Sequence, residues 1–224
     1  MKPGTQLPED ANSRIAESAA ASALDAFLKH PAIVRLARAL AARPGRIVEP
    51  GRPVRYAATA ATLRPGASGP ELLFIRRAEA DRDPWSGHVA WPGGRMEPGD
   101  ADLAATAVRE TFEETGIDLA GSGRLLGTLD DIYPQSQLLP SILVRPHVAV
   151  VGGHAVITPS REVAGFGWVP LAALLDEANW GTAPVTIRAV GVQERPVFRF
   201  AEFLVWGMTE RMLRQLASLL SDAG

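Results

Sequence analysis

The sequence predicts an α/β fold in which a mixed β-sheet lies between helices. Segments with strand and helix character are mixed along the chain without regular alternation, which favours a mixed sheet over a doubly wound parallel one. With 46% hydrophobic and 21% charged residues, the composition is typical of a globular protein rather than a disordered one. A chain of 224 residues is short for two full domains, so we expect one domain with an extension.

The composition also excludes several classes of protein. The chain contains no cysteine, which excludes a disulfide framework, a thiolate metal site and a cysteine nucleophile. A formal charge of −2 gives no reason to expect nucleic-acid binding. No apolar run is long enough to span a bilayer, and the polar start lacks the apolar segment of a signal peptide. We therefore expect a soluble, cytoplasmic protein that binds neither nucleic acid nor membrane.

Residues 1–50 are expected to form a tail and a helical extension, and residues 51–224 the main domain. Residues 13–30 are alanine-rich, with a partial helical stripe of apolar residues. Pro31 interrupts this segment, and residues 32–43 continue as a second helix with one apolar face. The two helices are expected to pack on the main domain or on a second subunit, so a homodimer is one prediction.

The main domain is predicted to contain several strands and three helices, separated by glycine and proline. The expected strands are residues 54–63, 71–77, 88–91, 124–129, 141–151 and 163–169, followed by a hairpin over 185–206. A short helix is expected from Leu171, and a last one over 209–220. The best-marked helix covers residues 100–115, because Asp100 can cap its start and Gly116 can close its end in the left-handed conformation.

The helix predicted over residues 100–115 carries three glutamates on one face. Glu110, Glu113 and Glu114 stand at i, i+3 and i+4, so they share a single turn at the surface. Three apolar residues are expected on the opposite, buried side: Ala105, Val108 and Phe112. Mg²⁺ and similar hard cations prefer oxygen ligands shared with waters and phosphates. The pattern predicts a metal site beside the preceding glycine loop, with an acidic surface balanced by Arg109 as the alternative.

The spacing of residues 93–117 resembles the Nudix box of hydrolases that act on nucleoside-diphosphate-linked compounds. That pattern is G-x5-E-x7-R-E-U-x-E-E-x-G-U, where U is apolar. The second half matches here in order and spacing: Arg109-Glu110, Glu113-Glu114, Gly116 and Ile117. Thr111 takes the first apolar position, and the loop from Gly94 is one residue longer than the pattern. Either Glu97 or Asp100 then takes the first acidic position.

One branch of that family, the coenzyme A pyrophosphatase-like proteins, is more similar still, because it shares the longer loop. Its upstream pattern LLTxR(S/A)x3Rx3Gx3FPGG corresponds here to Leu72-Leu73, Arg77-Ala78, Arg82, Gly87 and Trp91-Pro92-Gly93-Gly94. The threonine is missing, one residue is added before Gly87, and Trp91 replaces phenylalanine. Later stretches around Glu162 and Trp206 are also similar. The resemblance covers about residues 54–220 and implies a Nudix-type α/β/α sandwich.

The resemblance implies hydrolysis of a pyrophosphate bond with Mg²⁺ or Mn²⁺ as cofactor and a nucleotide-type substrate, most closely coenzyme A or a derivative. It makes the three glutamates the metal ligands, joined by the backbone carbonyl of Gly93. Arg109 would hold the glutamates in place. Other nucleotides, namely ADP-ribose, dinucleoside polyphosphates or damaged nucleoside triphosphates, are alternative substrates. A binding protein without turnover is disfavoured, because such proteins generally lose the metal-binding glutamates.

The resemblance leaves the general base and the substrate contacts open. Glu162 precedes a predicted strand at a comparable position and is one candidate for the base, with Glu110 as the other. Arg77 and Arg82 are expected to contact substrate phosphates, and so is Arg76, with ion-paired or solvated arginines as the alternative. The tryptophans of the glycine-rich loop, Trp85 and Trp91, either stack on a base or pack in the core.

Overall fold

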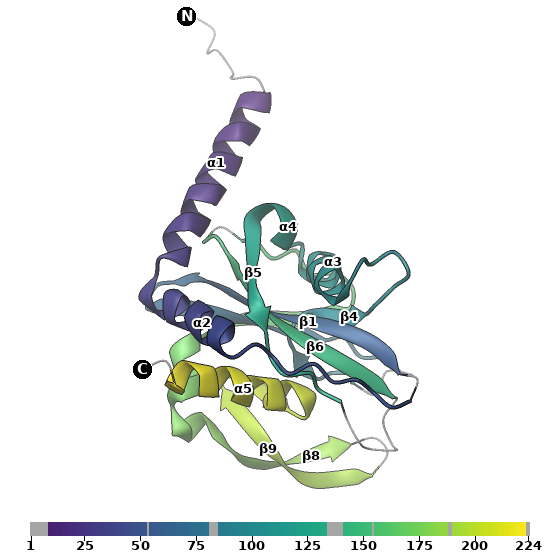
Figure 1. Ribbon diagram of the computed structural model, residues 1–224. Helices are drawn as coiled ribbons and strands as arrows, with labels where there is room; N and C mark the ends of the chain where they lie inside the picture. The colour runs from purple at the N-terminus through teal and green to yellow at the C-terminus, as the bar shows by residue number, and fades with distance from the viewer. Residues whose placement is uncertain are drawn as a thin grey trace, which may run out of the picture.

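The computed structural model describes residues 9–52, 54–80, 85–133, 141–153, 155–187 and 190–222. The predicted phosphate contact Arg82 lies outside these ranges. A central sheet lies between two helical layers, with a smaller sheet beside one of them (Figure 1). The predicted α/β sandwich with a mixed sheet and N-terminal helices is thus confirmed.

The central sheet has seven strands in the described part of the chain, in the order β3-β2-β1-β6-β5, with β4 paired to β1 and β7 paired to β2. They are β1 (Arg55–Gly66), β2 (Gly69–Arg77), β3 (Val89–Ala90), β4 (Gly93–Arg95), β5 (Gly123–Thr128), β6 (Ile142–Val151) and β7 (Val163–Pro170). Strands β1 and β6 run parallel, and the other pairs are antiparallel. Each predicted strand of this region is present within a few residues of its expected limits.

Helices cover both faces of the central sheet. They are α1 (Glu9–Leu28), α2 (Pro31–Ala42), α3 (Leu103–Thr115), α4 (Leu119–Ser122) and α5 (Met208–Asp222), with 3-10 turns η1 (Leu171–Leu175) and η2 (Glu177–Asn179). Helices α3 and α4 lie on one face, and α2 and α5 on the other (Figure 1). Alternate residues of a strand point to opposite faces. Accordingly, Leu73 packs on the α3 side, whereas Leu72 and Phe74 pack on the α5 side.

The C-terminal hairpin predicted over 185–206 is wrong, because three strands form there. They are β8 (Trp180–Ile187), β9 (Gly191–Phe200) and β10 (Phe203–Trp206). Phe200 pairs with Phe203, so β9 turns into β10 through two residues. Ala201 occupies this turn with a φ of 47°, a left-handed conformation that glycine or asparagine usually supplies. The turn therefore carries no recognisable sequence signal, and the sequence does not predict the break between β9 and β10.

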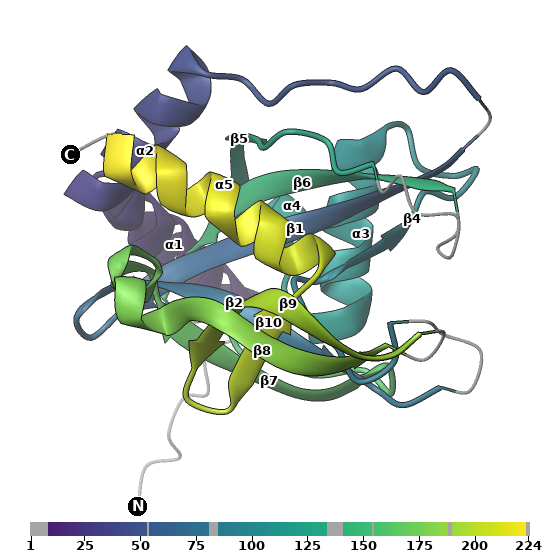
Figure 2. The ribbon, with the colours of Figure 1, turned by 90° about the horizontal axis from the view of Figure 1, so that it is seen from below.

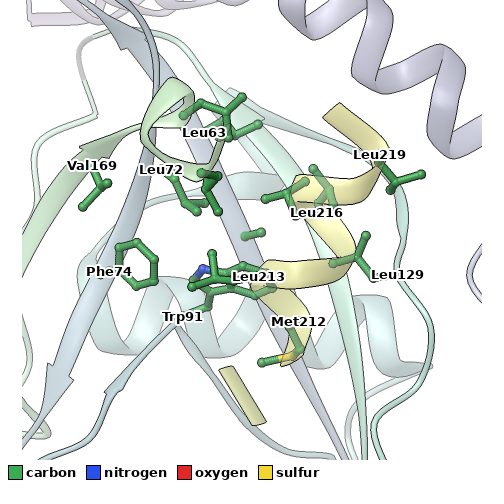
Figure 3. Packing of buried hydrophobic residues seen from close by; sticks show 14 of the residues in the cluster. Leu63, Leu72, Phe74, Trp91, Leu129, Val169, Met212, Leu213, Leu216 and Leu219 are labelled. Carbon is green, nitrogen blue, oxygen red and sulfur yellow. The ribbon is translucent and has the colours of Figure 1, made fainter. Parts of the chain in front are cut away.

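The largest core cluster lies between the central sheet and helix α5. Leu213 and Leu216 project from α5 toward Trp91 and Leu72 of the sheet side (Figure 3). Figure 2 shows α5 lying across the sheet, with β8 to β10 beside it. Trp91 is 1% exposed, which places it in the core and not on a substrate surface. Burying such side chains contributes about 1.5–3 kcal/mol each, so this cluster dominates the stability of the domain.

The N-terminal helices pack on the main domain, which was one of the two predicted alternatives. Ile33 and Leu36 of α2 are fully buried in the same core cluster as α5. The segment that follows runs along the end of strand β5, where the N–H of Arg46 donates to Asp130 Oδ1 at 2.9 Å. A Cβ on Gly45 would lie 2.1 Å from the carbonyl oxygen of Leu129, so only glycine fits there. The domain division at residue 50 and the homodimer stay predictions.

Helix α3 begins later and faces the sheet differently than predicted. Its N-cap is Asp102, whose carboxylate accepts the N–H of Ala105 at 2.8 Å, and the expected cap Asp100 lies before the helix. Phe112, expected in the core, is 57% exposed. Small side chains such as Ala107 are buried instead, and they allow α3 to lie close to the alanine-rich strand β1. The left-handed Gly116 at its C-terminus is confirmed, with a φ of 74°.

No helix in the described ranges is both long enough and apolar enough to cross a membrane.

Candidate active site

A cleft of about 760 Å³ opens at one end of the central sheet. Its walls come from strands β1 and β4, helix α3, the loop before β3, the start of β7 and the junction between β10 and α5. Glu110, Glu114, Glu162, Arg77 and Gly93 all line it. Residues that are far apart in the sequence therefore share one concave surface, as expected for a small-molecule site.

Glu114 is the most buried carboxylate of the cleft, with 3% of its surface exposed. Its Oε2 accepts the N–H of Gly93 at 2.9 Å, and its Oε1 lies 3.6 Å from the guanidinium of Arg77. Burial raises the pKa of Glu114 to about 7 against the lowering effects of those two partners, and the charges of Glu110 and Glu162 raise it further. The predicted surface position of Glu114 is wrong, because this side of α3 faces the sheet.

Arg109 connects the other acidic groups of helix α3. Its Nη1 donates to Glu110 Oε1 at 3.0 Å and to Glu113 Oε2 at 3.1 Å. Its Nε and Nη2 each donate to Asp100 at 2.9 Å, a bidentate pair that holds the pKa of Asp100 well below its usual range. Nη2 also donates to the carbonyl of Arg95 at 2.9 Å. One guanidinium thus fixes two glutamates of α3, the strand β4 and the loop between them.

Glu97 and Asp100, the two candidates for the first acidic position, have different surroundings in the structure. Asp100 is the residue that pairs with Arg109, while its Oδ2 also accepts the N–H of Glu97 at 2.9 Å. Glu97 itself lines the cleft. Glu113 lies apart from both, because its side chain is 55% exposed and is not part of the cleft wall.

Two adjacent glycines bring the strand backbone close to the glutamates. A Cβ on Gly93 would lie 2.4 Å from the carbonyl oxygen of Ala58 on strand β1. A Cβ on Gly94 would lie 2.3 Å from Glu110 Oε1. Both distances are far below van der Waals contact, so neither position accepts a larger residue without displacing backbone or carboxylate. The Gly93–Gly94 corner therefore allows strand β4 to lie close to strand β1 and to Glu110.

The donor atoms at this end of the cleft fit a hard divalent cation in chemical type, since they are carboxylate and backbone oxygens. Burial also disfavours the charged form of Glu110 as well as of Glu114, which a bound cation would offset. Among the described residues, however, no three acidic or imidazole side chains are gathered around one point in the way a metal requires. Glu110 and Glu113 are turned toward Arg109 instead.

Glu162, the candidate base, lines the cleft directly before β7. Its backbone carbonyl accepts the N–H of Ala78 at 2.8 Å, which fixes the start of β7 against the end of β2. Its side chain is exposed, and its charge is close enough to raise the pKa of both Glu110 and Glu114. The structure thus brings Glu162 together with two of the three glutamates predicted as metal ligands.

The arginines of the cleft differ in part from those expected. Arg77 lines it beside Glu114, and its contact with substrate phosphate stays a prediction. Arg76 is directed elsewhere, because its Nη2 donates to the carbonyl of Glu202 at 3.1 Å. Arg95 and Arg161 also line the cleft, although sequence reasoning missed them. Their positions directly after the glycine corner and directly before Glu162 were the available signals.

Aromatic side chains form another part of the cleft wall. Trp85 and His88 come from the loop before β3, and Trp206 from the end of β10. The rings of His88 and Trp206 lie 4.3 Å apart between centroids. Trp206 was not predicted as a site residue, although the similarity of its stretch to the coenzyme A pyrophosphatase-like branch was an available signal.

Comparison with known proteins identifies the family. Residues 54–189 match the family model described as the NUDIX domain. The uncharacterized Nudix hydrolase NudL of Yersinia enterocolitica is 34% identical over 165 residues, which cover 70% of this chain and 79% of that protein. NudL of Yersinia pestis (strain Pestoides F) is 33% identical over 154 residues, covering 68% and 73%.

Solved structures share the fold. A MutT/nudix family protein from Enterococcus faecalis superposes with a TM-score of 0.53 at 13% identity, covering 97% of this chain and 76% of that one. An Ap4A hydrolase from C. elegans, in a binary complex, superposes with a TM-score of 0.50 at 19% identity, covering 75% and 99%. These neighbours show that the chain has the fold of this family, and the family model and the sequence relatives show its membership. The chain therefore belongs to the Nudix hydrolases, which cleave a pyrophosphate bond of a nucleotide substrate and generally use Mg²⁺ or Mn²⁺.

Proposed function

We propose that this enzyme hydrolyses the pyrophosphate bond of coenzyme A or of a coenzyme A derivative. The observation that supports this proposal most is the composition of the cleft. Its acidic end carries Glu110 and Glu114 beside the Gly93–Gly94 corner. The same cleft is lined by Arg77, which belongs to the upstream pattern that resembles the coenzyme A pyrophosphatase-like branch.

Glu110, Glu113 and Glu114 would hold the metal, with the carbonyl of Gly93 as a further oxygen ligand. When bound, the cation neutralises phosphate oxygens and makes a bound water more acidic. One nitrogen of Arg109 donates to the carboxylates of both Glu110 and Glu113, and cation binding would replace part of those contacts. Because Arg109 also binds Asp100 and Arg95, its own position does not depend on the glutamates.

The chemical step requires a water that attacks phosphorus and a group that takes its proton. Glu162 lines the same cleft as Glu114 and can accept that proton as general base, while the phosphorus–oxygen bond of the leaving phosphate breaks. Glu110 is the alternative base. Arg77 and Arg161 present positive charge to the phosphate oxygens, where charge develops during the reaction.

A substrate panel tests this proposal. The purified full-length protein would be incubated with Mg²⁺ and coenzyme A, ADP-ribose, a dinucleoside polyphosphate or nucleoside triphosphates, and the products identified by mass spectrometry. We expect 4′-phosphopantetheine and adenosine 3′,5′-bisphosphate from coenzyme A. Glu114→Gln should lower turnover by orders of magnitude, whereas Glu177→Gln, on the exposed turn η2, should not. Faster turnover of another nucleotide, with coenzyme A left intact, would refute the substrate assignment.

The subunit state is tested separately. The homodimer predicted from the helical extension would give twice the chain mass of 23.9 kDa in light scattering. A mass of one chain over a range of protein concentrations would refute it.

A further inference from the structure

The aromatic part of the cleft wall has no role in the chemistry proposed above. It consists of Trp85, His88 and Trp206, which we call the aromatic wall. All three side chains are half-buried, so each keeps exposed surface beside the cleft. Trp91, in contrast, is buried in the core. The aromatic wall therefore offers ring surface to a ligand where Trp91 does not.

The aromatic wall lies next to the acidic end of the cleft. The carbonyl of His88 accepts the N–H of Arg77 at 2.9 Å, so these two residues are paired neighbours on adjacent segments. The guanidinium of Arg77 in turn lies 3.6 Å from Glu114. A substrate whose pyrophosphate lies at Glu114 therefore has the aromatic wall in the same cleft, on the segment that pairs with Arg77.

Trp206 is held in place by the C-terminal part of the chain. It pairs with Val197 of β9 and is followed by Gly207, whose φ of 72° reverses the chain into helix α5. Residues 203–222 lie beyond the part of the chain that matches the NUDIX domain family. Trp206 thus lies on a different segment from the cleft glutamates, so substrate selectivity can be changed there without changing the catalytic groups.

A flat ligand has to stack on the outer ring surface of the aromatic wall, because His88 and Trp206 contact each other directly. His88 and Trp206 lie 4.3 Å apart with an interplanar angle of 50°, so they contact each other without stacking in parallel. A nucleobase presents a flat π surface, and its stacking on an aromatic side chain contributes about 1–3 kcal/mol in other nucleotide-binding proteins. Arg77 and Arg161 of the same cleft supply the charge that the attached phosphates require.

We propose that the aromatic wall formed by Trp85, His88 and Trp206 binds the adenine base of the substrate by stacking, and thereby selects adenine nucleotides. This inference rests on the proposed function, since it takes the pyrophosphate to lie at the acidic end. It makes Trp206 and His88 specificity residues that act on substrate binding.

Two ligands that differ only in the base provide the test. Dissociation constants of AMP and ribose 5-phosphate would be measured with the full-length protein by ligand-observed NMR. We expect wild type to bind AMP about 5- to 150-fold more tightly than ribose 5-phosphate. Trp206→Leu, which keeps an apolar side chain but removes the ring, should abolish most of that preference and leave ribose 5-phosphate binding unchanged. Trp168→Leu is the matched control, because Trp168 packs under Arg64 and does not line the cleft.

His88→Leu supplies a second variant that decides the question if Trp206→Leu fails to fold. A preference for AMP that survives in every folded variant of the aromatic wall would overturn the proposal. So would wild-type protein that binds the two ligands equally, or variants that lose affinity for 4′-phosphopantetheine and keep it for AMP. Failure to hydrolyse coenzyme A, with the AMP preference lost on substitution, would refute the proposed substrate and leave the adenine site standing.

Discussion

The buried carboxylate of Glu114 gives the metal-free protein a specific dependence of stability on pH. In the folded protein its pKa is raised from 4.5 to about 7, chiefly by burial. Folding therefore favours the protonated form of this group. The contribution of Glu114 to the free energy of unfolding is fully present below pH 4.5, which is its pKa in the unfolded chain. It is lost as the pH rises through about 7.

The size of the effect follows from that difference in pKa. Each tenfold change in an ionisation equilibrium corresponds to about 1.4 kcal/mol, so a change from 4.5 to about 7 amounts to about 3 kcal/mol. The side chain is only 4% exposed, so solvent screens the effect little. Glu114→Gln keeps the shape and an oxygen that can accept the N–H of Gly93, but it cannot ionise.

Urea unfolding of wild type and Glu114→Gln, followed by circular dichroism from pH 4.5 to 8 with EDTA present, measures this contribution. Other titrating groups are common to both proteins, so the difference between the two free energies of unfolding isolates Glu114. We expect the Glu114→Gln variant to gain about 3 kcal/mol relative to wild type across this range. Mg²⁺ at pH 8 should stabilise wild type more than the variant. Two parallel curves would refute the reasoning that burial raises the pKa of Glu114.

Three further substitutions test the geometry of the cleft and its supports. Gly94→Ala should lower turnover by about tenfold or more with little change in Tm, because its Cβ would lie 2.3 Å from Glu110 Oε1. Gly99→Ala is the control, because a Cβ there would have no atom within 4 Å. Equal activity of the two variants would contradict this account. Gly45→Ala should lower the free energy of unfolding by about 1–3 kcal/mol in urea titrations, because the added Cβ would lie 2.1 Å from the carbonyl oxygen of Leu129, just after β5. Unchanged stability would disprove that contact. Glu162→Gln should lower kcat by about 10²–10⁴-fold with little change in KM, and a wild-type kcat would assign the base elsewhere.

Local patterns were sufficient for much of the fold. Strands such as Gly69–Arg77 are apolar runs with clear glycine or proline limits, and the left-handed Gly116 ends helix α3 as expected. The three-stranded C-terminal sheet was not predicted, because the turn at Ala201 contains neither glycine nor asparagine. Helix α3 lies in the predicted region but buries a different face, since Phe112 is exposed although its apolar side chain predicts a core position.

In the candidate site, too, some features follow from local sequence and others depend on the tertiary structure. The sequence was enough to propose Glu110, Glu113, Glu114 and Arg109 as site residues, because the spacing of charged residues within one helix is a local property. Whether each of these side chains is buried depends instead on how the helix packs on the sheet. Glu114 is buried and Glu113 is not, because the helix rests on β1 with one side only.

The sequence by itself determined the family, the acidic helix and most of the secondary structure, since each depends on residues close together along the chain. Only the tertiary structure decided that Asp100 binds Arg109, that Arg161 reaches the cleft and that Trp206 stands beside His88. These contacts depend on the order of strands in the sheet and on where α5 and β10 pack against it. Contacts between distant segments are selected by the packing of the whole core, which no short stretch of sequence encodes.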